Sequence, residues 1–424
     1  MKYFSTRDKS KSCTFAKAAL SALASDGGLF VPETIPEYSQ SVKKSLPTMQ
    51  FCDIAMETVR PFVEPDIPVQ VLEEIVHSAY TFDVPLVNVG GRNVLELFHG
   101  PTAAFKDFGA RFMARAFSYL RRGENRSLKI LTATSGDTGG AVADGFFGVE
   151  GVTVTVLYPK GRVTPLQERQ ISGLGGNITA VSVEGSFDDC QRLAKAAFSD
   201  AELTKRLYLS SANSINIARL IPQAIYYTAA AAKAGGDIVC CVPSGNFGNL
   251  TAGMYAAKMG APIVQFIAAT NINKTFPVYL ESGNYNEQVS QATISNAMDV
   301  GAPSNFERMK SHWTLEEMRR LLLSGYVTDD ETRATIKDVF DQHNYILDPH
   351  GAVGWHAAST FLQKGLVKKA ALTVLATAHP AKFAETVEPI TGKIPFPKTL
   401  QDAMQRSIKS TTIPADINAL KELL

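Results

Sequence analysis

The stretch Ile238-Val-Cys-Cys-Val-Pro-Ser-Gly-Asn-Phe-Gly-Asn249 joins a short apolar run to a glycine-rich turn. The apolar run, 238–242, predicts a buried strand, and 250–259 predicts a helix directly after the turn. The same alternation recurs along the chain, which predicts an α/β fold with a mostly parallel sheet covered by helices on both faces. Such sheets bind ligands beyond the carboxyl ends of their strands, so the turns at those ends are the candidate sites.

The remaining elements follow the same reasoning. Residues 1 to about 90 form a mixed N-terminal unit with proline-containing joints. A long alanine-rich helix is expected over 215–232, and Pro222 should kink or break it. Another helix is expected from about residue 187. Further buried strands are predicted over 128–133, 152–157, 178–183, 263–268 and 371–376.

The composition is that of an ordinary soluble globular protein. The 424 residues carry a net charge of +1, which offers no electrostatic footprint for nucleic acid or an anionic membrane. Five cysteines are few and odd in number, so we expect a reducing compartment. The run 18–24 is short and follows Lys17, which favours a first helix over a signal peptide. No run reaches the length of a membrane span, and we predict a cytoplasmic protein.

The turn 243–249 has the properties of a phosphate cradle. Gly245 and Gly248 allow backbone N–H groups to approach an anion closely, and the next helix adds its N-terminal dipole. Ser244, Asn246 and Asn249 supply further donors. The alternative is a plain glycine-rich turn with an asparagine cap.

A second turn, Thr132-Ala-Thr-Ser-Gly-Asp-Thr-Gly-Gly140, also lies between a strand and a helix. Its hydroxyls and free N–H groups suit a carboxylate or a phosphate, although Asp137 could simply cap the helix. Lys106 stands among Ala103, Ala104, Phe105 and Phe108. Apolar surroundings lower the pKa of an amine and make it nucleophilic, whereas a lysine that reaches solvent would have neither property.

Two further segments carry candidate polar groups. In Ser210-Ser-Ala-Asn-Ser-Ile-Asn-Ile-Ala-Arg219, Asn213 and Ser214 precede a helix and Arg219 follows within it. This cluster could clamp a second anion, with bidentate donors from the arginine, or could be only a cap and a solvated side chain. Thr377 places a hydroxyl at the end of the strand 371–376.

Several familiar motifs are absent from the sequence. There is no G-x-x-x-x-G-K-[ST], G-x-G-x-x-G, G-x-S-x-G or H-E-x-x-H pattern. Cys240 and Cys241 should point to opposite faces of a strand, and His350 and His356 lack a usual zinc spacing, so no metal site is expected. A phosphate cradle, a desolvated lysine and two further anion loops together indicate pyridoxal phosphate, bound as a Schiff base and acting on an amino acid.

These segments resemble the threonine synthase family of fold-type II pyridoxal-phosphate enzymes, and the resemblance covers nearly the whole chain. The most specific matches are His99-Gly-Pro-Thr-Ala-Ala-Phe-Lys-Asp107, Ala133-Thr-Ser-Gly-Asp-Thr-Gly139 and Ser244-Gly-Asn-Phe-Gly-Asn249. Asp26-Gly-Gly-Leu-Phe-Val-Pro32 and Asn296-Ala-Met-Asp-Val-Gly-Ala-Pro-Ser-Asn305 also match. The resemblance implies two open, twisted, mostly parallel sheets like those of the tryptophan synthase β subunit, plus an N-terminal domain.

The resemblance also implies residue roles. Lys106 would carry the cofactor, and the loop formed by Ser244, Gly245, Asn246, Phe247, Gly248 and Asn249 would hold its phosphate. Asp137 would lie near the cofactor 3′-oxygen, where related enzymes often have asparagine, and Thr377 would meet the pyridine nitrogen. The substrate would be bound by Thr134, Ser135, Thr138, Asn213, Ser214 and Arg219. A further cation for its phosphate is sought among Lys160, Arg162 and Arg169.

The implied reaction converts O-phospho-L-homoserine and water into L-threonine and phosphate by γ-elimination and β-addition, with Lys106 as the mobile base. The implied domains are 1–90, a large domain of 91–125 and 215–395, a small mobile domain of 126–214, and a tail of 396–424. The implied assembly is a monomer. Two alternatives stay open: a phospholyase or amino-acid dehydratase on the same scaffold, and a binding protein that has lost catalysis.

Overall fold

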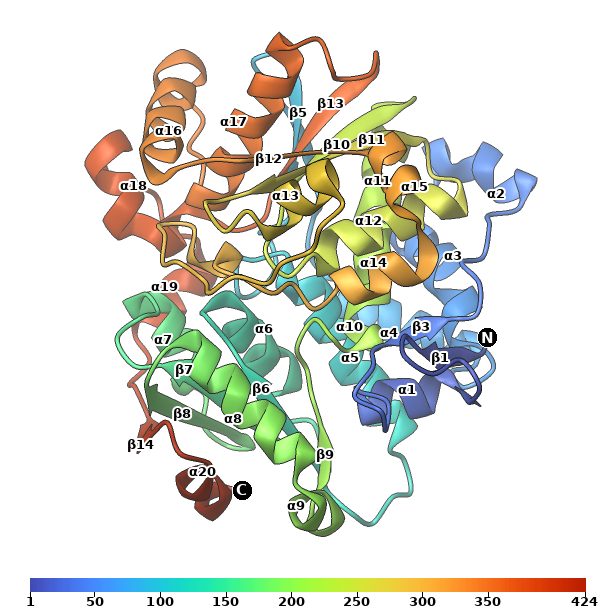
Figure 1. Ribbon diagram of the computed structural model, residues 1–424, viewed down its shortest axis with the longest axis vertical. Helices are drawn as coiled ribbons and strands as arrows, with labels where there is room; N and C mark the ends of the chain where they lie inside the picture. Colours follow the sequence, from blue (N-terminus) through green and yellow to red (C-terminus); the bar gives the residue numbers. More distant parts are fainter.

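The computed structural model describes residues 1–424, the side chains of Ala201 and Lys205 excepted. Figure 1 shows two lobes, one above the other, with the N-terminal segment against their shared side. Each lobe is built on its own sheet, so the predicted α/β architecture with two mostly parallel sheets is confirmed.

The upper sheet has six strands in the order β12-β11-β10-β13-β5-β4. All neighbouring pairs are parallel except β4 and β5. The strands are β4 Leu86–Val89, β5 Arg92–Glu96, β10 Ile238–Pro243, β11 Ile263–Thr270, β12 Leu322–Tyr326 and β13 Ala371–Ala376.

Helices cover both faces of this sheet. One face packs against α11 (Ala224–Ala234) and α12 (Gly248–Met259), and the other against α16 (Asp329–His343) and α17 (Pro349–Gln363). The central strand β10 is buried along its whole length. Cys240 and Cys241 on this strand belong to different core clusters, which confirms that they point to opposite faces.

The lower sheet has five strands, all parallel, in the order β14-β8-β7-β6-β9. They are β6 Leu128–Ala133, β7 Val152–Pro159, β8 Ile178–Glu184, β9 Tyr208–Ser210 and β14 Ser410–Pro414. One face packs against α8 (Phe187–Ser199) and α20 (Ile417–Leu423), and the other against α6 (Asp137–Phe146). The segment 396–424 therefore contributes a strand to this lobe, although it lies nearly 200 residues from β9 in sequence.

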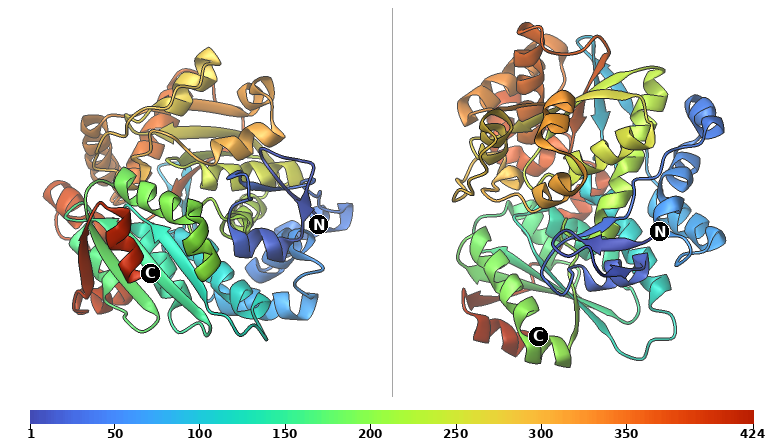
Figure 2. Two further views of the ribbon diagram at one scale, coloured as in Figure 1. Left: turned by 60° about the horizontal axis from the view of Figure 1, so that its bottom comes forward. Right: turned by 45° about the vertical axis from the view of Figure 1, so that its right-hand side comes forward.

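The N-terminal unit is a small three-stranded antiparallel sheet with four helices. Its elements are β1 Tyr3–Ser5, β2 Ser12–Cys13, α1 Phe15–Ser21, β3 Phe30–Pro32, α2 Gln40–Ser45, α3 Phe51–Val63 and α4 Val69–Ala79. Helix α1 ends at Ser21, because Ala22 adopts a left-handed backbone conformation with φ of 61°. The right-hand view in Figure 2 places this unit beside the junction of the two lobes.

The remaining helices connect or flank these layers. Pro222 interrupts the predicted helix over 215–232 as expected, because a 3₁₀ turn at Ile221–Gln223 separates α10 (Ile217–Leu220) from α11. The others are α5 Lys106–Leu120, α7 Pro165–Ser172, α9 Ala201–Arg206, α13 Thr275–Ser282, α14 Phe306–His312, α15 Leu315–Leu321, α18 Ala384–Thr391 and α19 Lys398–Met404. Among the described residues, no helix is long and apolar enough to cross a membrane.

Candidate active site

One cleft lies where five strands end. The segments that follow β5, β6, β9, β10 and β13 all reach it, from both lobes, as expected for ligand sites in parallel sheets. The predicted residues that line it are Lys106, Thr134, Ser135, Asp137, Thr138, Asn213, Ser214, Arg219, Ser244, Gly245, Asn246, Phe247, Gly248, Asn249 and Thr377.

Lys106 is the first residue of α5, and its amine points into the cleft. Its Nζ lies 3.8 Å from Asp137 Oδ2 and 5.1 Å from the centre of the Phe105 ring. Burial lowers the pKa of this amine, with help from Lys382 and Arg219, although Asp137 acts in the opposite direction. A lowered pKa leaves more of the amine unprotonated and nucleophilic near neutral pH.

Asp107 fixes the turn that presents Lys106. Its fully buried carboxylate accepts hydrogen bonds from Thr102 Oγ1 at 2.5 Å and from Thr102 N at 2.9 Å. Burial raises the pKa of Asp107 to about 6. Within the same turn Ala103 has φ of 54°, a conformation that costs a residue with a Cβ atom and persists only where the surroundings impose it.

The turn 244–249 has little room for side chains near its first glycine. A Cβ atom on Gly245 would lie 2.7 Å from Met298 Cα and 2.9 Å from Ala297 O. Phe247, with φ of 59°, is the residue before α12, so the turn aims backbone N–H groups at the cleft from the start of that helix. A side chain at Gly245 would push the cradle out of this position.

The two polar atoms of the Asn249 side chain differ in their hydrogen bonding. Its Oδ1 accepts hydrogen bonds from the hydroxyls of Tyr226 at 2.6 Å and Tyr227 at 2.7 Å. Its Nδ2 is buried and has no partner within the described part of the chain. A buried amide donor without a partner is costly, and an anion in the cradle would satisfy it.

Ser244 and Asn246 are held by the protein itself. The Ser244 hydroxyl donates to Val242 O at 2.9 Å. Asn246 Nδ2 donates to Ser214 Oγ at 2.6 Å, and its Oδ1 accepts from Ser304 N at 2.5 Å. These two side chains shape the cradle and connect it to the segment that follows β9.

The turn after β6 is held in shape by hydrogen bonds between the Thr134 side chain and the backbone of the turn. The Thr134 hydroxyl accepts from Gly136 N at 3.0 Å and Gly139 N at 2.9 Å and donates to Gly136 O. This bonding shapes the turn so that Ser135 and Thr138 line the cleft. The structure therefore gives Thr134 a supporting role in the turn.

Asp137 is the most heavily bonded polar group of the cleft. Its Oδ1 accepts from Gln167 Nε2 at 2.9 Å and forms an ion pair with Lys382 Nζ at 2.8 Å. Burial opposes its ionisation, yet Lys382 and Lys106, followed by His350, outweigh that cost and hold the pKa of the carboxyl well below its usual range. The lowered pKa favours an ionised carboxylate at Asp137, next to the Lys106 amine.

The residues predicted to form a second anion clamp line the cleft, but some of their hydrogen-bonding groups already bond other parts of the protein. Asn213 bonds the backbone of Ala133 through both ends of its amide, at 2.6 Å and 3.2 Å. Arg219 is 2% exposed and donates from Nη1 to Ala212 O at 2.6 Å. Its Nε has no partner within the described residues. Burial lowers the pKa of Arg219 to about 10, so the guanidinium keeps its charge at neutral pH.

Thr377 directly follows β13. Its carbonyl accepts from Phe105 N at 2.9 Å, and its buried side chain lines the cleft. The three cations considered for the substrate phosphate lie elsewhere. Lys160 forms an ion pair with Glu184 at 2.9 Å, and Arg169 donates a hydrogen bond to Arg406 O at 2.6 Å. Within the described part of the chain, none of Lys160, Arg162 and Arg169 lines the cleft.

Three polar residues of this region were not predicted from the sequence. Lys382 is fully buried beside Asp137. His350 lines the cleft, with its Nδ1 2.6 Å from Asp348 Oδ2 and its Nε2 accepting from Ala297 N at 3.2 Å. Arg308 donates to the carbonyls of Phe30, Ser214 and Ile215, which joins all three parts of the fold.

The donor set fits pyridoxal phosphate. The unpartnered Asn249 amide and the crowded Gly245 turn form a cradle for a phosphate beside the start of α12. The Lys106 amine opens into the same cleft and can bind an aldehyde. The hydroxyl of Thr377 can meet a ring nitrogen at the end of β13.

Comparisons with known proteins agree with this geometry. A family model of pyridoxal-phosphate dependent enzymes matches residues 94–377, and models of the threonine synthase N terminus and C-terminal part match 2–80 and 351–424. The chain is 42% identical to the threonine synthase of Escherichia coli, with 100% of this chain and 99% of that protein covered. It is 36% identical to that of Saccharomyces cerevisiae, with 91% and 88% covered.

Solved structures show the same similarity. The crystal structure of threonine synthase from Escherichia coli superposes with a TM-score of 0.92 at 41% identity, covering 100% of this chain and 99% of that one. A pyridoxal-phosphate-bound threonine synthase from Brucella melitensis gives 0.92 at 38% identity, with 100% and 98% covered. This chain belongs to the threonine synthase family of pyridoxal-phosphate-dependent enzymes.

Proposed function

We propose that this protein catalyses the conversion of O-phospho-L-homoserine and water into L-threonine and phosphate. It is then a carbon–oxygen lyase that acts on a phosphate ester. The observation that carries the proposal is that the Lys106 amine shares one cleft with a phosphate cradle at 244–249 and a second set of donors at 135–138 and 213–219. A cofactor phosphate and a substrate phosphate each need such a set, because two anions in one cleft repel each other.

The cofactor site is assigned to the cradle, Lys106, Asp137 and Thr377. Lys106 would hold the cofactor covalently, and residues 244–249 would bind its phosphate through backbone N–H groups and the Asn249 amide. When bound, pyridoxal phosphate draws electron density from the carbons of the amino-acid substrate. Thr377 lies at the end of β13, where its hydroxyl can meet the ring nitrogen.

The proton transfers are assigned to Lys106. The Lys106 amine would move protons at Cα and Cβ of the substrate. Its lowered pKa suits this work, because a base acts best when its pKa lies near the working pH. Asp137 stays ionised beside it and can accept a hydrogen bond.

The substrate site is assigned to the lower lobe and its junction. Ser135 and Thr138 line the cleft and supply hydroxyls for an anionic group. Arg219 supplies the buried positive charge, and its unpartnered Nε is available to a phosphate oxygen. Asn213 holds the backbone of Ala133, and the Ser214 hydroxyl accepts a hydrogen bond from Asn246 Nδ2. Thr134 supports the turn that carries Ser135.

The domain assignment also enters the proposal. We take 1–90 as the N-terminal domain, 91–125 with 215–395 as the large domain, 126–214 as the small mobile domain and 396–424 as the C-terminal segment. A polar contact crosses between the lobes, because Ser290 Oγ donates to Asp188 Oδ2 at 2.9 Å. Closure of 126–214 over the substrate would shield the proton transfers from bulk solvent.

The first experiment is spectroscopic. Protein reconstituted with pyridoxal phosphate should show the visible absorbance of lysine-bound cofactor, and borohydride reduction should attach the cofactor at Lys106. Lys106→Ala should lack both signals, whereas Lys369→Ala, a surface lysine distant from the cleft, should keep them. A wild type that stays colourless after reconstitution would refute the proposal.

The second experiment separates the alternative activities. Incubation with O-phospho-L-homoserine should give threonine and phosphate. Formation of 2-oxobutyrate from threonine would indicate a dehydratase, release of phosphate with another product would indicate a phospholyase, and cofactor binding without turnover would indicate a binding homologue. The buried Arg219 favours a phosphorylated substrate over plain serine or threonine.

Assembly and location remain predictions of the sequence reasoning. We expect a cytoplasmic monomer that acts on a small molecule, with no nucleic acid or membrane partner. Sedimentation of the reconstituted protein at several concentrations measures the first point, and a mass near 45.8 kDa is the expected result.

A further inference from the structure

Lys382 is a buried lysine for which the reaction described above has no task. It lies in the 3₁₀ turn Pro380–Phe383, five residues after Thr377. Its side chain has no exposed surface, and its Nζ contacts Asp137 Oδ1 at 2.8 Å and donates to Thr102 O at 2.8 Å. A lysine is almost never fully buried unless it is paired, so this position requires its partners.

The contacts of Lys382 cross the cleft. Asp137 begins α6 in the lower lobe, whereas Lys382 and Thr102 belong to the upper one. Thr102 also binds Asp107, the residue that fixes the turn carrying Lys106. Lys382 therefore joins the acid beside the catalytic amine to the turn that presents that amine.

The two oxygens of Asp137 are used differently. Oδ1 takes both strong partners, Lys382 Nζ at 2.8 Å and Gln167 Nε2 at 2.9 Å. Oδ2 is left facing the Lys106 amine at 3.8 Å. Two donors on one oxygen set the plane of the carboxylate, so the other oxygen is aimed at the atom that carries the cofactor.

We propose that Lys382 is a positioning residue that holds the Asp137 carboxylate ionised and oriented toward the Lys106 amine. The inference rests on the proposed function only in taking Lys106 as the cofactor-bearing residue. The physical reason is that an unpaired carboxylate in this buried place would take up a proton and turn its oxygen into a donor. With Lys382 present, Asp137 accepts a hydrogen bond from Lys106 or from the group bound to it.

The groups that face Asp137 come from four elements. Lys106 of α5 and His350 of α17 lie on the side of the cleft, and Lys382 and Gln167 lie behind the carboxylate. Burial raises the pKa of Asp137, and Lys382 is the largest of the charges that lower it. Removal of Lys382 should therefore raise the pKa of Asp137.

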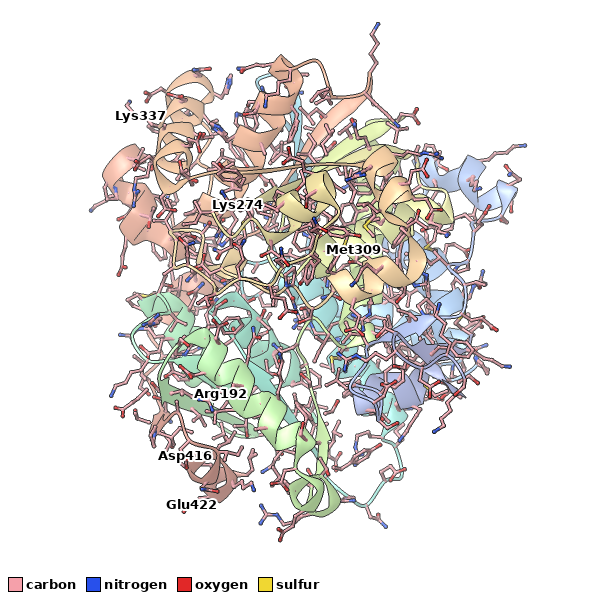
Figure 3. The ribbon with its side chains drawn as sticks, in the orientation of Figure 1. Arg192, Lys274, Met309, Lys337, Asp416 and Glu422 are labelled. Atoms are coloured by element: carbon pink, nitrogen blue, oxygen red, sulfur yellow. The ribbon has the colours of Figure 1, made fainter. Side chains whose placement is uncertain are left out.

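The test follows the visible absorbance of the reconstituted protein as a function of pH. Wild type should show no transition from Asp137 between pH 5 and 9. Lys382→Met should gain one, because a carboxyl that is buried without its nearest opposite charge has a pKa well above its usual range. Lys337→Met is the control, since Lys337 is exposed on α16 and lies at the surface (Figure 3).

A double variant identifies the titrating group. Asp137→Asn combined with Lys382→Met should lose the new transition, because asparagine does not titrate, and Lys382→Arg should restore a profile like that of wild type. If Lys382→Met binds cofactor poorly, the double variant should bind it better, because no unpaired carboxylate is then buried. An unchanged pH profile in Lys382→Met, or equal impairment of the single and double variants, would overturn the inference.

The outcome of this pH test does not depend on whether the proposed reaction is correct. The spectra need only the cofactor on Lys106 and no substrate. A wild type that makes threonine while Lys382→Met keeps the wild-type pH profile would overturn this inference alone. A new transition in Lys382→Met, with no threonine formed by wild type, would support the inference and refute the proposed reaction.

Discussion

Gly245→Ala is the substitution that tests the phosphate cradle most severely. The added Cβ atom would meet Met298 Cα at 2.7 Å and Ala297 O at 2.9 Å, whereas ordinary contacts begin at 3.4 Å. Both neighbours are backbone atoms and cannot swing aside. One of the two segments must therefore move by roughly 0.7 Å, an estimate that takes the difference between the close and the ordinary contact.

The size of the effect follows from where the strain appears. Without cofactor the turn can relax away from Met298, but bound phosphate requires the turn to return to its place. Overpacking a fixed site costs about 1 to 3 kcal/mol. Since about 1.4 kcal/mol is tenfold, the dissociation constant for pyridoxal phosphate should rise by roughly 5- to 150-fold.

The assay is titration of cofactor-free protein with pyridoxal phosphate, followed by visible absorbance. Gly236→Ala is the matched control, because Gly236 lies just before the same strand and a Cβ atom there meets nothing within 4 Å. Thermal unfolding of both cofactor-free variants shows whether either has lost its fold. A well-folded Gly245→Ala protein that binds cofactor as tightly as Gly236→Ala would refute the cradle assignment.

Three other changes have defined outcomes. Arg219→Ala should raise KM for O-phospho-L-homoserine by about 10-fold or more, as expected for loss of a charged hydrogen bond, and equal losses of substrate and cofactor binding would contradict its role. The pKa of Asp107 is raised to about 6 by burial, so its ionisation lowers stability as pH rises from about 4 to about 6. The free energy of unfolding, measured from pH 4 to 8, should fall by at most about 3 kcal/mol in wild type and should lose this fall in Asp107→Asn. The same pH slope in both proteins would contradict the raised pKa of Asp107. Arg308→Met should destabilise the protein by about 3 kcal/mol or more, because it leaves buried carbonyls of Phe30, Ser214 and Ile215 without donors; a loss no larger than that of Lys310→Met in chemical denaturation would contradict it.

Much of the fold was predictable because its central strands have strong local signals. β10 is apolar at every position and ends at a proline and a glycine-rich turn, so strand, turn and helix are all marked in sequence. Pro222 marks the break between α10 and α11 for the same reason, since its ring excludes a backbone hydrogen bond.

Other strands could not be found locally. β14 has mostly exposed residues and depends on β8 for its pairing, which only the tertiary fold supplies. The strands β1 to β3 have two or three residues each, too few for a period to be seen. Their positions follow from contacts with helices distant in sequence.

The residues of the candidate site likewise include some with a local sequence signal and some without one. Lys106 and the glycines of 244–249 were predicted because their residue types suit the chemistry in a local pattern. Lys382 lies five residues beyond Thr377, and a lysine beside alanine and phenylalanine has the pattern of one that reaches solvent. Its burial arises from the turn at Pro380–Phe383 and from Asp137, which lies 245 residues away in the chain.

The ionisation state of Asp137 could not be predicted from the sequence. Lys382 answers this point, because it pairs with the carboxylate at 2.8 Å and is itself fully buried. The pairing could not be read from spacing, since it depends on how the two lobes pack against each other.

The most direct test of the proposed reaction is turnover of O-phospho-L-homoserine in water labelled with ¹⁸O. Elimination breaks the bond between Cγ and oxygen and water then adds at Cβ, so the label should appear in the threonine hydroxyl and the released phosphate should be unlabelled. Labelled phosphate with homoserine as the product would show simple hydrolysis of the ester, and it would contradict the assignment of Lys106 and its cofactor to this reaction.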